Sequence, residues 1–120
     1  MNVTEVNAHI DIPESVKKQT AVFCNCALEQ LGKSNWEVSV LFCGDAEIEE
    51  LNSVYRNRKA PTDVLSFPQK DDFTAHDRNY AGDVVISLET AQRQTENGKY
   101  AAADAGETVK LLLVHGILHL

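Results

Sequence analysis

The sequence predicts an α+β fold in which a single layer of about four mixed β-strands packs with helices. Two observations predict this class. Four segments are apolar, β-branched or alternating and are bounded by turn residues: 1–12, 36–43, 62–67 and 82–88. Four others have helical apolar spacing or helix-start signals: 13–31, a segment that begins at Asp45 and ends before Pro61, 87–98 and 104–120. We expect residues 1–120 to form one domain with the element order β-α-β-α-β-loop-β-α-α.

The first half of the chain predicts two strand–helix pairs. Pro13 suits the first turn of the first helix, and Asp45 is expected to cap the second helix. The apolar face expected for the first helix comprises Val16, Thr20, Phe23, Ala27 and Leu31. The buried stripe expected for the second comprises Ile48, Leu51, Val54 and Tyr55.

The second half begins with a short strand, residues 62–67, between two prolines that lie outside it. The polar stretch 69–80 has no periodicity, and we expect it to be a mobile loop. The β-branched run 82–88 predicts the fourth strand. Ser87 is then expected to begin a polar helix, and a largely apolar helix ends the chain.

Composition indicates a cytoplasmic protein. The sequence is 43% hydrophobic, contains no apolar run near 18 residues, and shows no secretory signal, so we expect no membrane association. Its three cysteines form no C-x-x-C pair, which disfavours a disulfide framework or a cysteine zinc site. We expect reduced thiols, with Cys26 a small core residue.

The charge of the chain is strongly negative, with a net value of −7. This value disfavours broad, nonspecific binding of nucleic acid, which depends on Lys and Arg. However, Arg56, Arg58 and Lys59 lie within four residues, and no acidic residue separates them. The sequence therefore predicts a focused positive site on an acidic body.

Two histidines, His115 and His119, lie four residues apart in the apolar run KLLLVHGILHL. On an α-helix this spacing places both rings on one face, where two imidazoles can bind the same metal ion. The alternative is that both are core residues whose ring nitrogens are satisfied within the protein. A catalytic zinc site normally has three protein ligands and an open position, and no third ligand is visible in this sequence.

Gly116 lies between the two histidines, and a glycine inside a helix costs about 1 kcal/mol relative to alanine. We expect the close approach of another backbone or of a ligand to explain it. In the H-E-x-x-H helix of metalloproteases, the same position holds the glutamate that acts as general base. A metalloprotease-like hydrolase is therefore an alternative that the histidine spacing allows and that Gly116 disfavours.

The end of the sequence is unusual for a helix. Residues 117–120 are apolar, with neither a glycine cap nor a basic residue in the final turn. A free carboxylate at this position also opposes the helix dipole. We expect the 120 residues to be a truncated form, in which a turn and further metal ligands follow Leu120.

The stretch LNSVYRNRKAPTDVLSFP, residues 51–68, is a second candidate site. On one interpretation it is a helix end, a turn and a strand, with Arg56 as a solvated cation at the helix C-terminus. On the other, Arg56 binds a phosphate with two hydrogen bonds near the metal. Thr62 and Ser66 can each donate a hydrogen bond either to a phosphate or to the turn backbone, and the sequence leaves both possibilities open.

This stretch, followed by GDVVIS and HGILHL, resembles the YbeY family of metal-dependent single-strand endoribonucleases, which act in bacterial ribosomal RNA maturation. The three motifs occur in the family's order across residues 51–120. The resemblance implies that His115 and His119 are two of three zinc (Zn²⁺) ligands, and that a third histidine follows five positions after Leu120. It also implies that Arg56 is catalytic.

The resemblance implies RNA binding by Arg56, Arg58 and Lys59, and a role in ribosomal RNA processing, 16S 3′-end maturation and ribosome quality control. The partners would be single-stranded ribosomal RNA and the small ribosomal subunit or its proteins. Thr62 and Asp83 match motif positions without an assigned role, and Asp83 is expected to orient a histidine or to cap a neighbour. The alternative function is a non-catalytic ribosome-assembly factor, which the acidic surface suits.

Overall fold

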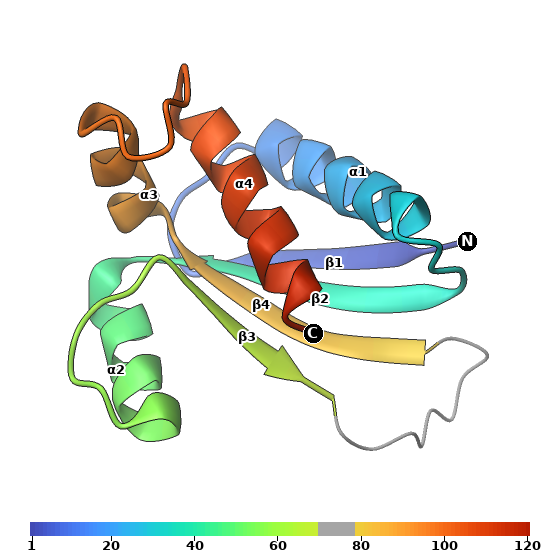
Figure 1. Cartoon of the computed structure of the whole chain (residues 1–120), viewed down its shortest axis with the longest axis horizontal. Coiled ribbons are helices and arrows are strands. Elements are labelled where there is room, and N and C mark those ends of the chain that lie inside the picture. The colour runs from blue at the N-terminus through green and yellow to red at the C-terminus, as the bar shows by residue number, and fades with distance from the viewer. Residues whose placement is uncertain (70–78) are drawn as a thin grey trace.

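The computed structural model describes residues 1–69 and 79–120, and these residues form a four-stranded sheet and four helices (Figure 1). The strands are β1 (Val3–Ala8), β2 (Trp36–Cys43), β3 (Val64–Pro68) and β4 (Asn79–Ser87). The helices are α1 (Glu14–Gln30), α2 (Asp45–Arg56), α3 (Leu88–Glu96) and α4 (Ala105–Leu118). The expected α+β class and the expected element order are confirmed.

The sheet is mixed, with the strand order β1-β2-β4-β3. The pairs β1–β2 and β2–β4 are parallel, whereas β3 runs antiparallel to β4 and forms an edge of the sheet. In Figure 1, α1 and α4 lie side by side over the sheet, and the C-terminal end of α4 crosses β4 near β3. This arrangement brings the end of the chain to the strand that follows α2.

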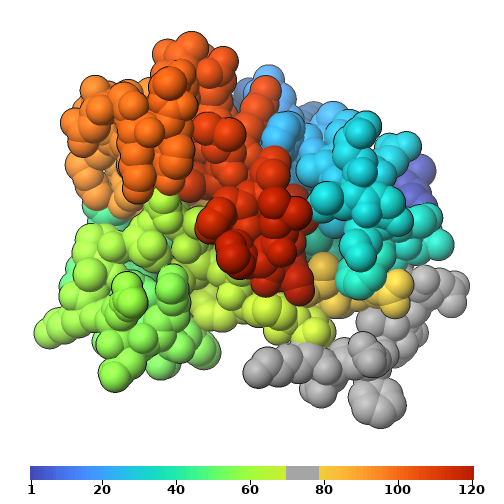
Figure 2. All heavy atoms as spheres, in the orientation of Figure 1, coloured from blue at the N-terminus to red at the C-terminus, as the bar shows by residue number. Residues whose placement is uncertain are grey.

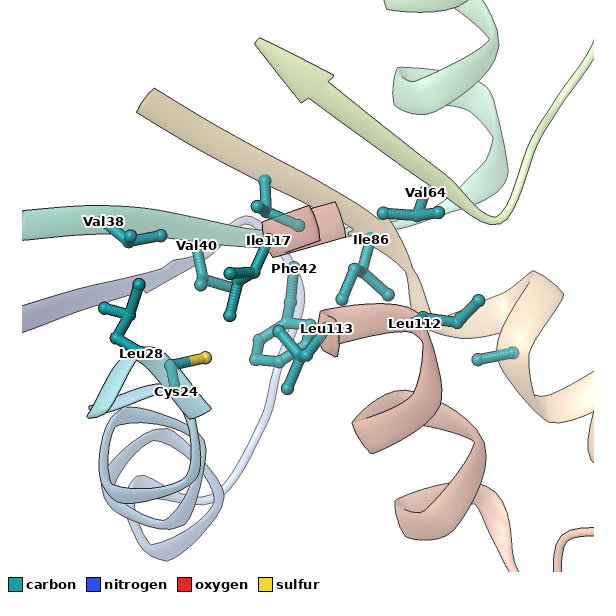
Figure 3. Packing of buried hydrophobic residues seen from close by; sticks show 12 residues of the cluster. Cys24, Leu28, Val38, Val40, Phe42, Val64, Ile86, Leu112, Leu113 and Ile117 are labelled. Atoms are coloured by element: carbon teal, nitrogen blue, oxygen red, sulfur yellow. The ribbon is translucent and has the colours of Figure 1, made fainter. Parts of the chain in front are cut away.

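The main core fills the space between the sheet and the helices α1 and α4 (Figure 3). Alternate residues of the central strands point toward these helices, as the period of two in a strand requires. The strands contribute Val38, Val40, Phe42, Val64, Val84 and Ile86. Helices α1 and α4 contribute Cys24, Leu28, Leu112, Leu113 and Ile117, and α3 adds Ala91.

The opposite face of the sheet carries a smaller core under α2. Its buried members are Cys43, Ile48, Leu65 and Val85, and Leu41, Leu51 and Phe67 pack against them. These strand residues alternate with those of the main core, so they point to the other face. Helix α2 is therefore separated by the sheet from the helix that carries the histidines.

The two expected helix faces are only partly correct. In α1, Phe23 and Ala27 pack against the core as expected, but the buried residues are Thr20, Cys24 and Leu28. Leu31 and Cys26, which were expected inside, are exposed. In α2 the buried residues are Ile48 and Asn52, and the expected Val54 and Tyr55 are 69% and 65% exposed. Helix α2 buries a narrow stripe because it packs only on the small core.

The expected cap at Asp45 is also wrong, because Gly44 occupies the cap position of α2. Asp45 is the first helical residue, and its carboxylate binds side chains of another element instead. Pro13, expected in the first turn of the first helix, occupies the cap position before α1, whereas the expected helix start at Ser87 is confirmed. The Ser87 hydroxyl accepts a hydrogen bond from Thr90 N, and the Asp104 carboxylate accepts one from Glu107 N, which begins α4.

The expected loop at 69–80 is only partly within the described residues, because 70–78, including His76, lie outside them. Asn79 and Tyr80 belong to β4, so the fourth strand begins earlier than expected. Among the described residues, no helix combines the length and the apolar character needed to cross a bilayer.

Candidate active site

Helix α4 presents His115 and His119 together on its exposed side, one turn apart. Their ring centroids are 4.4 Å apart and the ring planes meet at 59°. The opposite side of the helix is buried against the sheet through Leu113, Gly116 and Ile117. The core reading of the two histidines is therefore wrong, since both side chains face solvent at the end of an otherwise anchored helix.

Gly116 is required by the contact between α4 and the sheet. A methyl group added at this position would lie 2.6 Å from Val84 Cγ1 and 3.2 Å from Val64 Cγ2. A close approach is therefore present, but it comes from strand side chains and not from the other backbone or the ligand that the sequence led us to expect. A glutamate at this position would point into β4 and β3 and away from the histidine rings, so the metalloprotease arrangement does not fit this helix.

Arg56 ends α2 on the other side of the site, and the chain turns at once. Asn57 adopts the left-handed conformation with φ of 56°, which ends the helix. Asn52 then fixes the turn. Its side-chain Nδ2 donates to Ala60 O at 2.9 Å, and its backbone oxygen accepts from Arg58 N at 3.3 Å. Sequence reasoning missed Asn52, although its position four residues after Ile48 marks the same helix face.

A cavity of about 320 Å³ brings these two parts of the chain together. Its lining comprises Arg56, Val64, Leu65, Ser66, Pro68, His115 and His119. Figure 2 shows the C-terminal end of α4 at the molecular surface, next to the yellow-green atoms of the segment near β3. The predicted catalytic arginine and both predicted metal ligands therefore share one site.

The other two predicted RNA-binding residues do not line this cavity. Arg58 and Lys59 are exposed in the turn after α2. Lys59 instead borders a separate surface hollow of about 260 Å³ together with Glu49 and Glu50 of α2. The positive cluster is thus divided, because Arg56 lines the cavity with the histidines and Lys59 lies near acidic side chains.

The histidine pair fits two ligand positions of a zinc site. Within residues 1–69 and 79–120, no side-chain hydrogen bond occupies either imidazole ring, and both rings border a polar, open cavity. Their ring centroids lie 4.4 Å apart, close enough for the two imidazoles to share one ion. In the described part of the chain, however, no group of three His, Cys, Asp or Glu residues surrounds one point.

Asp83 does not orient either histidine. It lies on the sheet face opposite α4, where it accepts a hydrogen bond from the Tyr80 hydroxyl at 2.7 Å. The Tyr80 hydroxyl also lies 3.1 Å from Ser39 Oγ. Burial and the neighbouring carboxylate of Asp83 raise the pKa of Tyr80 to about 12.

Asp63 is a structural residue that sequence reasoning missed. Its carboxylate accepts hydrogen bonds from Val64 N at 2.8 Å, Gln94 Nε2 at 3.0 Å and the Tyr100 hydroxyl at 3.2 Å. Burial favours a higher pKa for Asp63, but these hydrogen bonds outweigh it and hold the pKa below its ordinary value. Asp63 thereby fixes the start of β3 against α3 and the segment before α4.

Comparison with known proteins identifies the family. A family model described as Endoribonuclease YbeY matches residues 2–120. The chain belongs to the YbeY family. Endoribonuclease YbeY of Treponema denticola is 45% identical over 101 residues, which cover 82% of this chain and 63% of that protein. Endoribonuclease YbeY of Aquifex aeolicus is 44% identical over 104 residues, which cover 87% of this chain and 66% of that protein.

A solved structure also shares the fold. The solution structure of TM1509 from Thermotoga maritima matches with a TM-score of 0.60 and 22% identity, over 98% of this chain and 71% of that one. The alignments with the two YbeY relatives span less than two thirds of those proteins' own length. Family membership thus stands on the sequence match across nearly the whole chain, and TM1509 supports the fold.

Proposed function

We propose that the protein is a zinc-dependent endoribonuclease that cleaves single-stranded RNA. The observation that carries this proposal is the cavity in which Arg56 lies with His115 and His119. An arginine and a pair of metal-ligating residues are the groups that phosphodiester cleavage needs, because negative charge develops on the phosphate. The relatives named Endoribonuclease YbeY support the same reaction class.

In this proposal His115 and His119 would provide two of the zinc ligands, and the family resemblance implies a third histidine ligand. The bound ion supplies Lewis acidity toward a phosphoryl oxygen, or lowers the pKa of a water molecule. Helix α4 keeps both rings on its exposed side, because Gly116 and Ile117 bury the other side against the sheet. The fold thus places the two imidazole rings side by side without a metal ion.

Arg56 holds the phosphate in this proposal. Its guanidinium can donate two parallel hydrogen bonds to phosphate oxygens and stabilise the charge that grows on them during cleavage. The Asn52 contacts keep the following turn in one conformation, so the end of α2 is fixed relative to β3. Arg58 and Lys59 lie outside the cavity and contact more distant phosphates of the same RNA strand.

The biological role that we propose is ribosomal RNA processing, including maturation of the 16S 3′ end and ribosome quality control. The partners are then ribosomal RNA and the small ribosomal subunit or its proteins. We place this activity in the cytoplasm, and the three free cysteines of the described chain support a reducing environment. The finer role rests on the family resemblance, whereas the reaction class also rests on the cavity.

The test is cleavage of a single-stranded RNA, with and without added Zn²⁺, by the wild type and two arginine variants. Arg56→Ala should reduce cleavage by about 10²–10³-fold, the effect of losing a donor to developing charge. Arg58→Ala is the matched control, because it removes the same charge two residues away and outside the cavity. Equal effects of the two substitutions would contradict the role of Arg56.

A non-catalytic assembly factor is the second candidate, and the net charge of −7 favours it because an acidic surface suits a protein partner better than bare RNA. The same assay separates the two candidates. If the wild type binds RNA but does not cleave it, with or without added zinc, the assembly factor is supported. Cleavage that requires zinc and Arg56 would exclude it.

A further inference from the structure

Ser66 forms a direct contact between the edge strand and the histidine helix. Its hydroxyl donates a hydrogen bond to the backbone oxygen of Gly116 at 2.8 Å, across 50 residues of sequence. Ser66 also lines the cavity that holds Arg56 and the two histidines. The contact therefore lies inside the candidate active site and joins its two sides.

The carbonyl of Gly116 also holds the backbone of the second histidine. His119 N lies 3.2 Å from Gly116 O and 3.3 Å from His115 O, in a last turn that tightens as the helix ends. His119 has φ of −90° and ψ of −1°, at the boundary of the helix. The carbonyl that accepts from Ser66 is thus one of the two that accept from the His119 amide at the end of the helix.

The local geometry explains why a serine is suited to this position. The last four carbonyls of a helix lack complete intrahelical partners and need other donors. Because Gly116 has no Cβ, the helix backbone approaches Val84 and Val64 closely enough for a short side chain on β3 to reach it. The side chain of Val64, the neighbouring residue on the same face of β3, has no hydrogen-bond donor.

The same geometry decides between the two roles that the sequence leaves open for Ser66. A serine hydroxyl has a single proton to donate. In the structure that proton is directed to Gly116 O, so Ser66 does not donate to a phosphate while this contact is made. Its place in the cavity is explained by the contact with the helix.

We propose that Ser66 is a positioning residue that sets the orientation of the last turn of α4 and thereby the relative placement of His115 and His119. The inference deepens the proposed zinc site and rests on it for its functional meaning. The hydrogen bond itself is independent of the metal. Edge strand β3 thus fixes the metal side of the site, while the turn that precedes it carries Arg56.

The test measures hydrogen exchange of the His119 amide by NMR in the zinc-free protein, followed by titration with Zn²⁺ alone. Ser66→Ala should speed exchange of this amide by about three- to tenfold and weaken zinc binding by a similar factor, as expected for loss of one hydrogen bond. Ser66→Thr retains the hydroxyl and should restore both values. Ser66→Cys, a weaker donor, should fall between them.

Thr20→Val is the matched control. It removes another hydroxyl that donates to a helix carbonyl at 2.8 Å, from Thr20 Oγ1 to Val16 O in α1. This control should lower stability without changing exchange at His119. The inference is overturned if Ser66→Ala leaves His119 exchange unchanged, or if Thr20→Val accelerates it equally.

Zinc titration of the wild type separates this inference from the proposed function. If the wild type binds no zinc but Ser66→Ala still accelerates His119 exchange, the positioning of the helix end is supported and the zinc proposal is contradicted. If zinc binds the wild type and the Ser66→Ala variant equally tightly, with equal His119 exchange, the positioning role is contradicted and the zinc proposal is supported.

Discussion

Two groups of polar side chains in this protein differ in whether other side chains supply their hydrogen-bond partners. The first, which we name the anchor cluster, comprises Asp45, Asp63, Ser87, Thr90, Arg93 and Gln94. The second is the cavity of Arg56, His115 and His119. In the anchor cluster each carboxylate has several internal partners, whereas no side-chain hydrogen bond joins the three cavity residues to other described residues.

The comparison shows that the shifted pKa of Asp45 comes from a contact between structural elements and not from the candidate active site. Asp45 accepts hydrogen bonds from Ser87 Oγ and Thr90 Oγ1 at 2.6 Å each and pairs with Arg93 at 2.7 Å. Burial favours a higher pKa, but these partners outweigh it and lower the pKa of Asp45 to about 2. Strongly shifted groups often indicate active sites, yet this one joins α2 to α3. The cavity is recognised instead because three side chains without hydrogen-bond partners among the described side chains line it together.

The largest expected effect comes from the histidines. His115→Ala and His119→Ala should each abolish zinc binding at the site and reduce RNA cleavage at least about 100-fold, because a ligand is lost. Thermal stability in the absence of metal should barely change, since both side chains are exposed. Zinc content, cleavage rate and melting temperature check this. His9→Ala, which removes the pairing with Glu47 elsewhere, should retain zinc and cleavage.

Gly116→Ala tests the close packing of the buried side of α4 against the sheet. The added methyl group meets Val84 and Val64, so the free energy of unfolding should fall by about 1–3 kcal/mol, as for other overpacked cores. Urea denaturation measures this change. Leu111→Ala, on the exposed side of the same helix, should change it by less than about 0.5 kcal/mol. Equal effects would show that α4 does not pack as described.

Asp45→Asn should lower the free energy of unfolding by about 1–2 kcal/mol at neutral pH, since it weakens charge-assisted hydrogen bonds. The folded-state pKa lies near 2, below the ordinary 3.8, so the charged carboxylate stabilises the fold above about pH 4. This contribution is lost as the pH falls through 2. The difference between the variant and the wild type should therefore disappear at low pH.

The smallest effect is expected outside the cavity. Removing Arg58 or Lys59 should weaken RNA binding only a few-fold and reduce the slope of log affinity against log salt by about one per residue. Binding measured at several salt concentrations checks this. A loss of cleavage as large as that for Arg56→Ala would mean that the site extends along the whole turn.

Much of the fold is readable from local pattern. The bounds of β2 were expected at residues 36–43 and are observed there, because alternation and a Gly-Asp break mark the strand. The face of α1 was only partly predicted. Thr20, Phe23 and Ala27 meet the core as expected, but the packing against α4 and the sheet makes Cys24 and Leu28 the most buried residues with Thr20. Local periodicity contains no information about that choice.

The candidate site was only partly predictable. The histidine pair follows from helical spacing, and Arg56 from its place in a motif. Their meeting in one cavity depends on β3 being the edge strand beside α4, which is a property of the tertiary structure. Apart from the residues adjacent to Asp63, the hydrogen-bond partners of Asp45 and Asp63 lie more than 30 residues away in sequence, so their structural roles were not readable.

The most direct test of the central claim is a Zn²⁺ titration of the protein with the histidine ring signals followed by NMR, and with RNA cleavage measured on the same samples. We predict that the ring signals of His115 and His119 shift together at about one zinc per protein, while those of His9 do not, and that cleavage appears in parallel. Zinc that binds elsewhere, or cleavage that proceeds without any shift of these two rings, would contradict the account.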